Sequence, residues 1–165
     1  MHHAGSDTPA DPHNANRGFW YAHMFWFWTK KTEFDDPKTQ AAYARDILRD
    51  PVLKFMSTRE FLGASQVIFG LFLYWLGGLD YVLWGIPCRL VAGYHITWFV
   101  NSACHYWGYK NFDIPGEDRA LNNWWVAILA WGEGWHNNHH AYSDSVRSGY
   151  KWWEFDVTYY VVRLL

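Results

Sequence analysis

The strongest constraint on how this chain folds is a pair of apolar runs separated by a short break. The first run, Phe61–Leu76, carries no formal charge, and the second, from Tyr81 to about His105, has Arg89 as its only Lys or Arg. The sequence GGLD at 77–80 lies between them. About 20 apolar residues are needed for a helix to cross a bilayer. The second run supplies this length and the first approaches it with a few flanking residues, so the two runs predict a helical hairpin.

The positions of the basic residues favour a membrane hairpin over a buried hairpin of a soluble protein. Residues 1–60 hold eight Lys and Arg and residues 106–165 hold five, whereas the connecting segment 77–86 holds none. Positive charge accumulates on the cytoplasmic side of membrane proteins, so both ends of the hairpin are expected there. The 13 Trp residues agree, because Trp and Tyr concentrate at membrane interfaces. The sequence predicts an all-α, multi-pass integral membrane protein with a histidine-rich helical cap on the cytoplasmic side.

This topology divides the chain into three segments. Residues 1–60 are expected to form a cytoplasmic segment with interfacial helices, 61–105 the transmembrane hairpin, and 106–165 the cytoplasmic cap. The second helix of the hairpin is expected to begin at Pro87 and to run to about Trp107. A single amphipathic helix is expected from Arg119 to about His140. The net charge of −2, without a basic stripe, argues against nucleic acid as a partner.

The sequence HNNHH at 136–140 is the densest group of potential metal ligands. In a helix, His139 and His140 would lie three and four residues after His136 on one face, and about 100° apart from each other. Three histidines in five positions favour metal ligation over a structural role. The isolated histidines are interpreted as structural or substrate-facing: His13, His23 and His95.

Two further places offer histidines. Asn101 and His105 are four residues apart at the predicted cytoplasmic end of the second helix, where polar residues are costly unless they face protein, water or metal. His2 and His3 are either a remnant of an expression tag or ligands supported by the nearby carboxylates of Asp7 and Asp11.

The three places together offer six histidines, more than the four ligands that a structural zinc takes. Two metal ions are therefore the better expectation. Imidazole suits zinc, copper, iron or nickel, and spacing alone does not choose among them. Two histidine-bound irons at a membrane surface would suit oxygen activation for attack on an apolar chain.

Three stretches together carry a family resemblance: HHAGSDTPADPHNANRGFWYAH, TWFVNSACH and GEGWHNNHH. They resemble the membrane fatty-acyl desaturases, most closely the Δ9 acyl-lipid and acyl-CoA group. The resemblance implies a di-iron centre, held by histidine boxes, that uses O2 and two electrons to insert a cis double bond. The implied metal ligands are His2 and His3 from the second box, His136, His139 and His140 from the third box, His105, and Asn101 through a water.

The resemblance also implies substrate contacts and partners. Thr97 and Trp98 match residues that line the bend of the acyl tunnel, and Arg17 and Asn14 lie where the family could anchor a head group. The expected partners are a fatty-acyl substrate linked to CoA or lipid, an electron donor such as a ferredoxin or a b-type cytochrome, and the lipid bilayer.

One part of the family pattern has no counterpart in the chain. The first box, H-x-x-x-x-H, is absent, and the first histidine of the second box would precede Met1. The chain is therefore expected to be an N-terminally truncated fragment that is inactive by itself. Two alternatives stay open: a related histidine-box hydroxylase or conjugase, and a non-catalytic membrane protein with a structural zinc or a bis-histidine haem.

Overall fold

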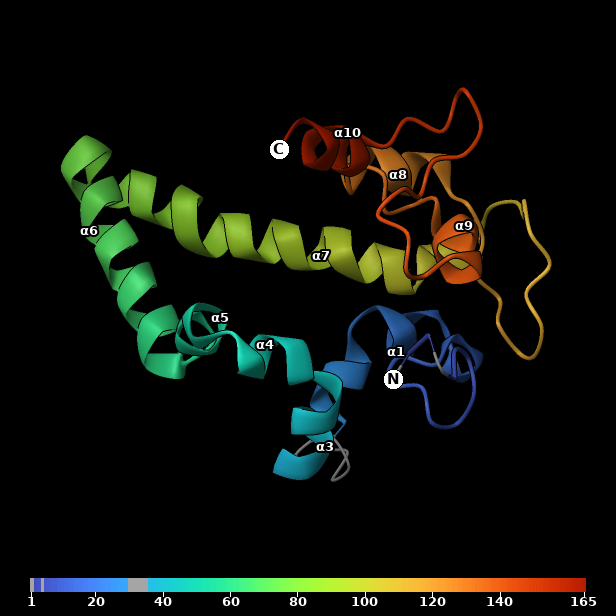
Figure 1. Cartoon of the computed structure of the whole chain (residues 1–165). Coiled ribbons are helices and arrows are strands. Elements are labelled where there is room, and N and C mark those ends of the chain that lie inside the picture. Colours follow the sequence, from blue (N-terminus) through green and yellow to red (C-terminus); the bar gives the residue numbers. More distant parts are fainter. Residues whose placement is uncertain (1, 4, 30–35) are drawn as a thin grey trace. The chain divides into compact units, whose positions relative to one another are not determined.

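The computed structural model describes residues 2–3, 5–29 and 36–165, and within them it contains helices and no strand. The predicted all-α class is confirmed. The chain forms two compact units (Figure 1): one combines Met1–Lys30 with Tyr94–Leu165, and the other is Lys31–Gly93. In the first unit the N-terminal residues pack with the C-terminal half of the chain. The division into the segments 1–60, 61–105 and 106–165 stays a prediction.

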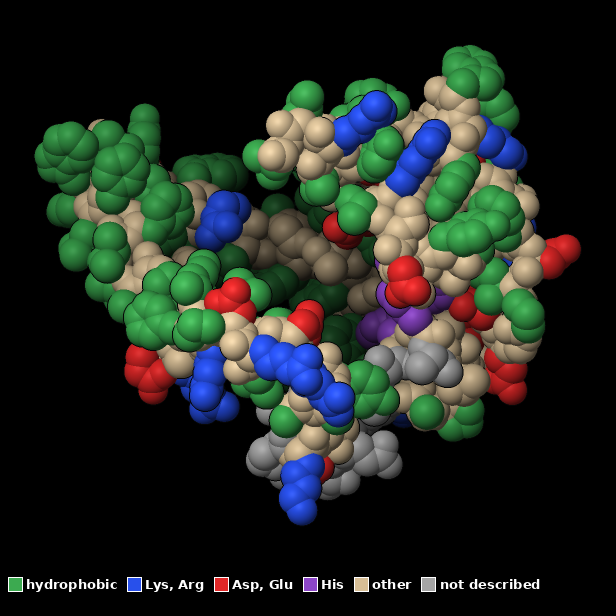
Figure 2. All heavy atoms as spheres, in the orientation of Figure 1, with side chains coloured by type: hydrophobic (Ala, Val, Ile, Leu, Met, Phe, Trp, Pro, Cys, Tyr) green, Lys and Arg blue, Asp and Glu red, His purple; other side chains and the backbone are tan. Residues whose placement is uncertain are grey.

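The unit Lys31–Gly93 consists of helices whose apolar side chains point outward. Three short helices, α3 (Pro37–Tyr43), α4 (Arg45–Arg49) and α5 (Pro51–Met56), precede the long helix α6 (Arg59–Leu83). None of the described side chains in 36–93 is buried. Figure 2 shows hydrophobic side chains covering α6. An exposed apolar surface of this extent is typical of a surface that meets another apolar phase.

The predicted break between the apolar runs is confirmed. Helix α6 loses helical geometry at Gly77 and Gly78, and Gly78 adopts φ 70° and ψ −155°. Because this backbone region is open almost only to glycine, the sequence itself ends the first arm here. The stretch Arg59–His105 is the one part of the described chain long and apolar enough to cross a membrane, and an 18-residue window within it has a mean hydropathy of 1.6.

The expected helix start at Pro87 is wrong. Helical structure has already resumed after Gly78, and Pro87 lies inside the π-helical turn η3 (Trp84–Cys88), which leads into α7 (Arg89–Asn101). Proline removes one backbone donor and collides with the preceding turn of an α-helix. A local π-turn accommodates both effects without ending the helix.

The other unit is built from short elements connected by ordered loops. Its N-terminal part holds η1 (Ala15–Arg17), α1 (Phe19–His23) and η2 (Phe25–Trp28). Its C-terminal part holds the end of α7, then η4 (Ala103–His105), α8 (Trp124–Leu129), α9 (His136–Ala141) and α10 (Val157–Leu164).

The expected single helix from Arg119 to His140 is also wrong. Helices α8 and α9 are separated by a turn in which Trp131 and Gly132 have positive φ values of 58° and 118°. Left-handed residues end a helix, and the Gly132 amide closes the end of α8 by donating to the Ala127 carbonyl at 2.8 Å. The turn changes the direction of the chain, so the positions of the histidines on α9 do not follow from the helical repeat of α8.

The core of this unit is small in its apolar part and polar in the rest. The apolar cluster consists of Val100, Ala103, Cys104, Val126 and Ala130. Buried polar residues include four aspartate and glutamate residues, Asp7, Asp11, Glu154 and Asp156, and three histidines, His23, His105 and His136. Burying ionisable groups is costly unless they are paired or bind a metal, so this polar core needs a specific explanation.

Candidate metal centre

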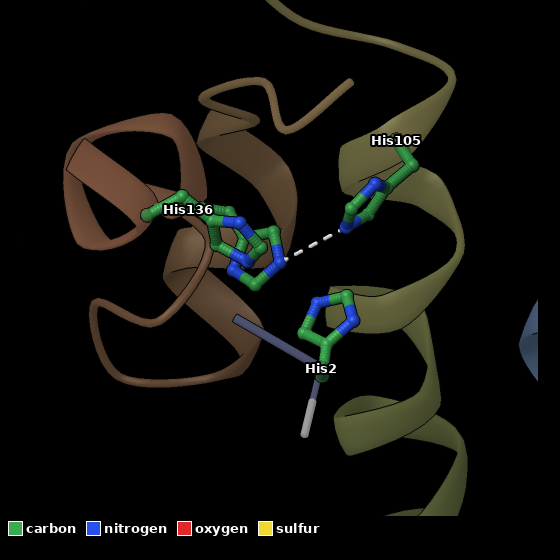
Figure 3. A group of neighbouring side chains, drawn as sticks. His2, His105 and His136 are labelled. Atoms are coloured by element: carbon green, nitrogen blue, oxygen red, sulfur yellow. Dashed lines mark hydrogen bonds between the residues drawn. The ribbon is translucent and has the colours of Figure 1, made fainter. Parts of the chain in front are cut away.

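Four histidines from three separate segments meet in the polar core. His2 comes from the N-terminal loop, His105 from η4, and His136 and His140 from α9. One nitrogen of each ring lies within 4.8 Å of those of the other three, and Figure 3 shows the rings of His2, His105 and His136 converging. We call these residues the four-histidine cluster.

Three rings of the cluster are oriented by carboxylates through their Nδ1 atoms. The pairs are His105 with Asp7 at 2.8 Å, His2 with Asp11 at 3.0 Å, and His140 with Asp118 at 2.6 Å. An ionised carboxylate only accepts hydrogen bonds, so each Nδ1 carries the proton. The Nε2 atom of each neutral ring then carries a lone pair, the tautomer in which a metal-binding histidine is held by a second partner.

The ring nitrogens that face one another in the four-histidine cluster carry too few protons for all of them to form hydrogen bonds. The Nε2 atoms of His105 and His136 lie 3.1 Å apart. Within residues 2–3, 5–29 and 36–165, the buried His2 Nε2, His140 Nε2 and His136 Nδ1 have no hydrogen-bond partner. Two nitrogens bound side by side to one metal at about 2.1 Å would lie about 3 Å apart. The donor set therefore fits a metal ion bound through imidazole.

A second pair of histidines lies beside the cluster. The Nε2 atoms of His3 and His139 also face each other at 3.1 Å, and the His3 ring lies 4.9 Å from that of His140. His139 and His140 thus point to different neighbours, as adjacent residues on one helix must. The structure brings every predicted histidine ligand into one region, as a group of four and a pair.

The charges in this region match the needs of metal ligands. Burial alone would raise the pKa of Asp11, but the hydrogen bond that it accepts from His2 and its electrostatic attraction to that ring outweigh burial and hold that pKa at about 2. Burial and the neighbouring imidazoles, His140 first, lower the pKa of His136 well below its usual value. Ionised carboxylates beside neutral imidazoles are the state in which histidine binds a metal.

Asp7 connects three parts of the chain around the cluster. Besides accepting from His105, it accepts backbone hydrogen bonds from Ala15 at 3.1 Å and Arg119 at 2.9 Å, and it is 1% exposed. Asp7 and Asp11 were expected as supporting carboxylates. Asp118 was missed, because it belongs to the turn-rich segment after α7 and lies far from any histidine in sequence.

Helix α9 is anchored by the two asparagines between its histidines. Asn138 Nδ2 donates to Glu154 Oε2 at 2.8 Å, and its Oδ1 accepts from Asn122 at 2.9 Å and Asn111 at 2.8 Å. Asn137 Oδ1 accepts from two backbone amides at 2.8 and 2.9 Å. Sequence reasoning missed this network, although two asparagines between ligands were a visible signal.

A cavity of about 440 Å³ opens beside the histidines. Its lining includes His3, His136 and His139 on one side, and Thr97 and Asn101 from α7 on another. Trp98 is not among the lining residues and stacks with Tyr94 instead. The wall formed by Thr97 and Asn101 places α7 next to the candidate centre.

The expected helical relationship between Asn101 and His105 is wrong. Helix α7 ends at Asn101, and His105 lies in η4, whose first hydrogen bond joins the His105 amide to the Ser102 carbonyl at 2.9 Å. The tighter turn moves His105 into the four-histidine cluster, whereas Asn101 stays on the cavity wall.

The remaining predicted residues lie in the N-terminal loop. Asn14 is buried, and its amide donates to the Thr8 carbonyl and accepts from the Asn16 amide, so it holds its own loop. Arg17 is exposed, with its guanidinium 3.7 Å from the centre of the Tyr21 ring. His13, interpreted as isolated, lies against the cluster with its ring centroid 4.2 Å from that of His2.

Comparison with known proteins agrees with this geometry. The sequence profile described as fatty acid desaturase matches residues 1–163. The chain belongs to the fatty acid desaturase family. This membership confirms the resemblance carried by the three histidine-containing stretches.

Several similar proteins are named as desaturases of lipid-linked acyl chains. The chain is 45% identical to the sn-1 stearoyl-lipid 9-desaturase of Anabaena variabilis over 100% of this chain and 58% of that protein. It is 47% identical to the sn-2 palmitoyl-lipid 9-desaturase of Nostoc sp. (strain 36), covering 100% of this chain and 57% of the relative. It is 42% identical to a chloroplastic palmitoyl-monogalactosyldiacylglycerol delta-7 desaturase of Arabidopsis thaliana, covering 99% and 43%. The chain spans about half the length of these relatives.

Proposed function

We propose that this chain carries most of the metal centre of an acyl-lipid desaturase that inserts a cis double bond at Δ9. The observation that supports it best is the convergence of four imidazole rings in the four-histidine cluster, three of which are fixed by Asp7, Asp11 or Asp118 so that their Nε2 atoms carry lone pairs. Membership of the family, which implies a di-iron centre, favours two iron ions over the other metals that imidazole binds.

The metal ligands we propose are His2, His3, His105, His136, His139 and His140, with Asn101 acting through a water. Iron bound there would supply the O2-dependent oxidation of an unactivated C–H bond. The chain's own residues hold the ligand geometry: the carboxylates fix the ring orientations, and Asn137 and Asn138 hold α9. Thr97, which lines the cavity, would position the acyl chain beside the centre.

We further propose that the chain is a multi-pass membrane protein with the centre on the cytoplasmic side. The apolar stretch Arg59–His105, broken at Gly78, would form the hairpin, and the basic residues flanking it favour a cytoplasmic location for both ends. The substrate would be a lipid-linked acyl chain, as the names of the relatives suggest, with Trp98 at the tunnel bend and Arg17 near the head group. The electrons would come from a ferredoxin or a b-type cytochrome.

The test compares two proteins in the same membrane preparation. The first is this chain, and the second is a fusion of this chain to the part of the Anabaena relative that it does not cover, which we expect to supply the remaining histidines of the family pattern. With iron, reductant and acyl lipid, the chain alone is expected to give no unsaturated product, because the second metal lacks ligands. The fusion is expected to give a cis Δ9 alkene, detected by gas chromatography and mass spectrometry.

The matched control is the fusion carrying His136→Ala, which is expected to be inactive. Turnover by the chain alone would contradict the ligand count. An alcohol without an alkene from the fusion would favour a hydroxylase, and an iron-loaded fusion without either product would contradict the proposal.

A further inference from the structure

A second buried group of histidines lies outside the metal centre. His23, at the end of α1, is 1% exposed, and its Nδ1 lies 2.9 Å from Ser102 Oγ. Its Nε2 lies 3.0 Å from Nδ1 of His95, which belongs to α7. We call this array, His95–His23–Ser102, the His23 chain. It joins residues 72 and 79 positions apart, which makes it a long-range contact rather than a local turn.

The direction of the hydrogen bonds in the His23 chain follows from Ser102. Its hydroxyl has one proton, which it donates to the Trp98 carbonyl at 2.8 Å. Ser102 Oγ must then accept from His23, so His23 Nδ1 carries the proton. In the neutral ring Nε2 is an acceptor, and His95 Nδ1 donates to it. Each member of the chain therefore fixes the tautomer of the next.

Ser102 occupies the point at which α7 changes into η4. It has φ −109° and ψ −69°, and its hydroxyl bonds back to the carbonyl four residues earlier, a contact that bends helices. Its own carbonyl accepts the amide of His105 at 2.9 Å. The conformation of Ser102 thus decides whether the residues after Asn101 continue the helix or turn His105 into the cluster.

We propose that His23 is a positioning residue for the metal centre: through Ser102 it holds the η4 turn that aims His105 at the four-histidine cluster. This inference rests on the proposed metal centre. Ligand atoms must be held to within about 0.5 Å for a metal site to keep its geometry. His105 lies at the junction of a helix and a short turn, which needs such an external anchor, and α1 provides it.

The test uses substitutions that separate the two nitrogens of His23. Asparagine places an amide donor close to the position of Nδ1, so His23→Asn keeps the bond to Ser102. Glutamine places its amide near the position of Nε2, so His23→Gln keeps the contact with His95 and loses the bond to Ser102. Ser102→Ala removes the same bond from the other side. Phe19→Leu is the packing control, because the Phe19 ring stacks on His23 at 5.6 Å and takes no part in the hydrogen bonds.

Each variant of the full chain is titrated with Co2+ in detergent, and the visible absorption of the bound ion reports both affinity and geometry. His23→Gln and Ser102→Ala are each expected to weaken Co2+ binding about 10–100-fold and to change the spectrum. The double variant is expected to lose no more than either single one. His23→Asn and Phe19→Leu are expected to keep the wild-type spectrum. If the His23 ring had a purely structural role, His23→Asn would be expected to change the spectrum.

The outcomes are distinguishable. If the wild-type chain binds Co2+ and His23→Gln binds it with unchanged affinity and spectrum, the positioning role is contradicted while the metal centre stands. If His23→Asn loses binding to the same extent as His23→Gln, the bond to Ser102 is not the cause and the inference is again contradicted. If the wild-type chain binds no Co2+, the proposed metal centre fails and this inference fails with it.

Discussion

The two compact units of this chain place opposite kinds of residue at their surface and in their interior. In the unit Lys31–Gly93 the described side chains are all at least partly exposed, and large apolar ones such as Trp75 and Ile68 are 78% and 67% exposed. In the unit containing the histidines, Asp7, Asp11 and His136 are buried almost completely. An apolar exterior suits a lipid environment, and a polar interior suits a metal ion.

The two units therefore depend on different sources of stability: surroundings outside the chain for the first, and internal polar contacts for the second. The outward apolar residues of the first unit gain little from burial within the chain, so their favourable surroundings must come from outside it. The polar core of the second unit is stable only if its hydrogen bonds are complete and its inward nitrogens have a ligand.

His136→Ala is expected to abolish tight metal binding. This ring is 3% exposed and its Nε2 faces that of His105, so its loss removes a ligand from the middle of the cluster. Since removal of a supporting partner alone costs about 10–100-fold in affinity, loss of a ligand should cost more than about 100-fold. Co2+ titration measures the effect. Tyr142→Ala, at the end of the same helix and 50% exposed, is the control and should bind normally.

Leu71→Arg tests the opposite unit. Leu71 is 66% exposed on α6, and in a water-soluble protein an arginine there would be nearly neutral. In a membrane helix it should disfavour insertion by about 2.5–3.5 kcal/mol. Glycosylation-site mapping in microsomes reports insertion, and Leu71→Phe provides the size-matched apolar control. Equal insertion of the arginine and phenylalanine variants would show that this surface does not face lipid.

Asp7→Asn is expected to weaken metal binding about 10–100-fold without removing a ligand. The amide can still accept from Arg119, but it no longer supplies a charged acceptor for the Nδ1 proton of His105. Metal titration against Asp144→Asn, an exposed acidic residue near the end of α9, isolates the contribution of the buried contact. Equal affinities for the two variants would show that Asp7 does not support metal binding.

The smallest effects come from a matched pair of helix caps, one in each unit. Thr58 caps α6 by accepting from the Phe61 amide, and Asn123 caps α8 by accepting from Val126. Thr58→Ala should cost about 1 kcal/mol of unfolding free energy. Asn123→Ala should cost about 2–3 kcal/mol, because the buried amide also donates to the Trp107 carbonyl. Denaturant unfolding in detergent compares them, and equal losses would argue against a tightly coupled polar core.

The parts of the molecule that could be predicted from the sequence are those governed by short-range pattern. The helical class, the break at Gly78 and the common face of His136 and His140 follow from apolar periodicity, glycine and residue spacing. The membership of the family followed from the three histidine-containing stretches.

The parts that could not be predicted depend on long-range contacts. Asp118 supports His140 across 22 positions, and His23 contacts Ser102 across 79, separations for which a single sequence carries no spacing rule. The placement of His105 in η4 also escaped prediction, because the residues from Ser102 to His105 include no proline or glycine that would mark the end of α7.

Iron K-edge X-ray absorption on the iron-loaded chain tests the central claim most directly. If the four-histidine cluster binds iron, the spectrum will show nitrogen ligands with the multiple-scattering pattern of imidazole, and His136→Ala will lose that pattern. Iron surrounded only by oxygen, or iron that is not retained by the wild-type chain, would contradict the assignment of the four-histidine cluster as a metal centre.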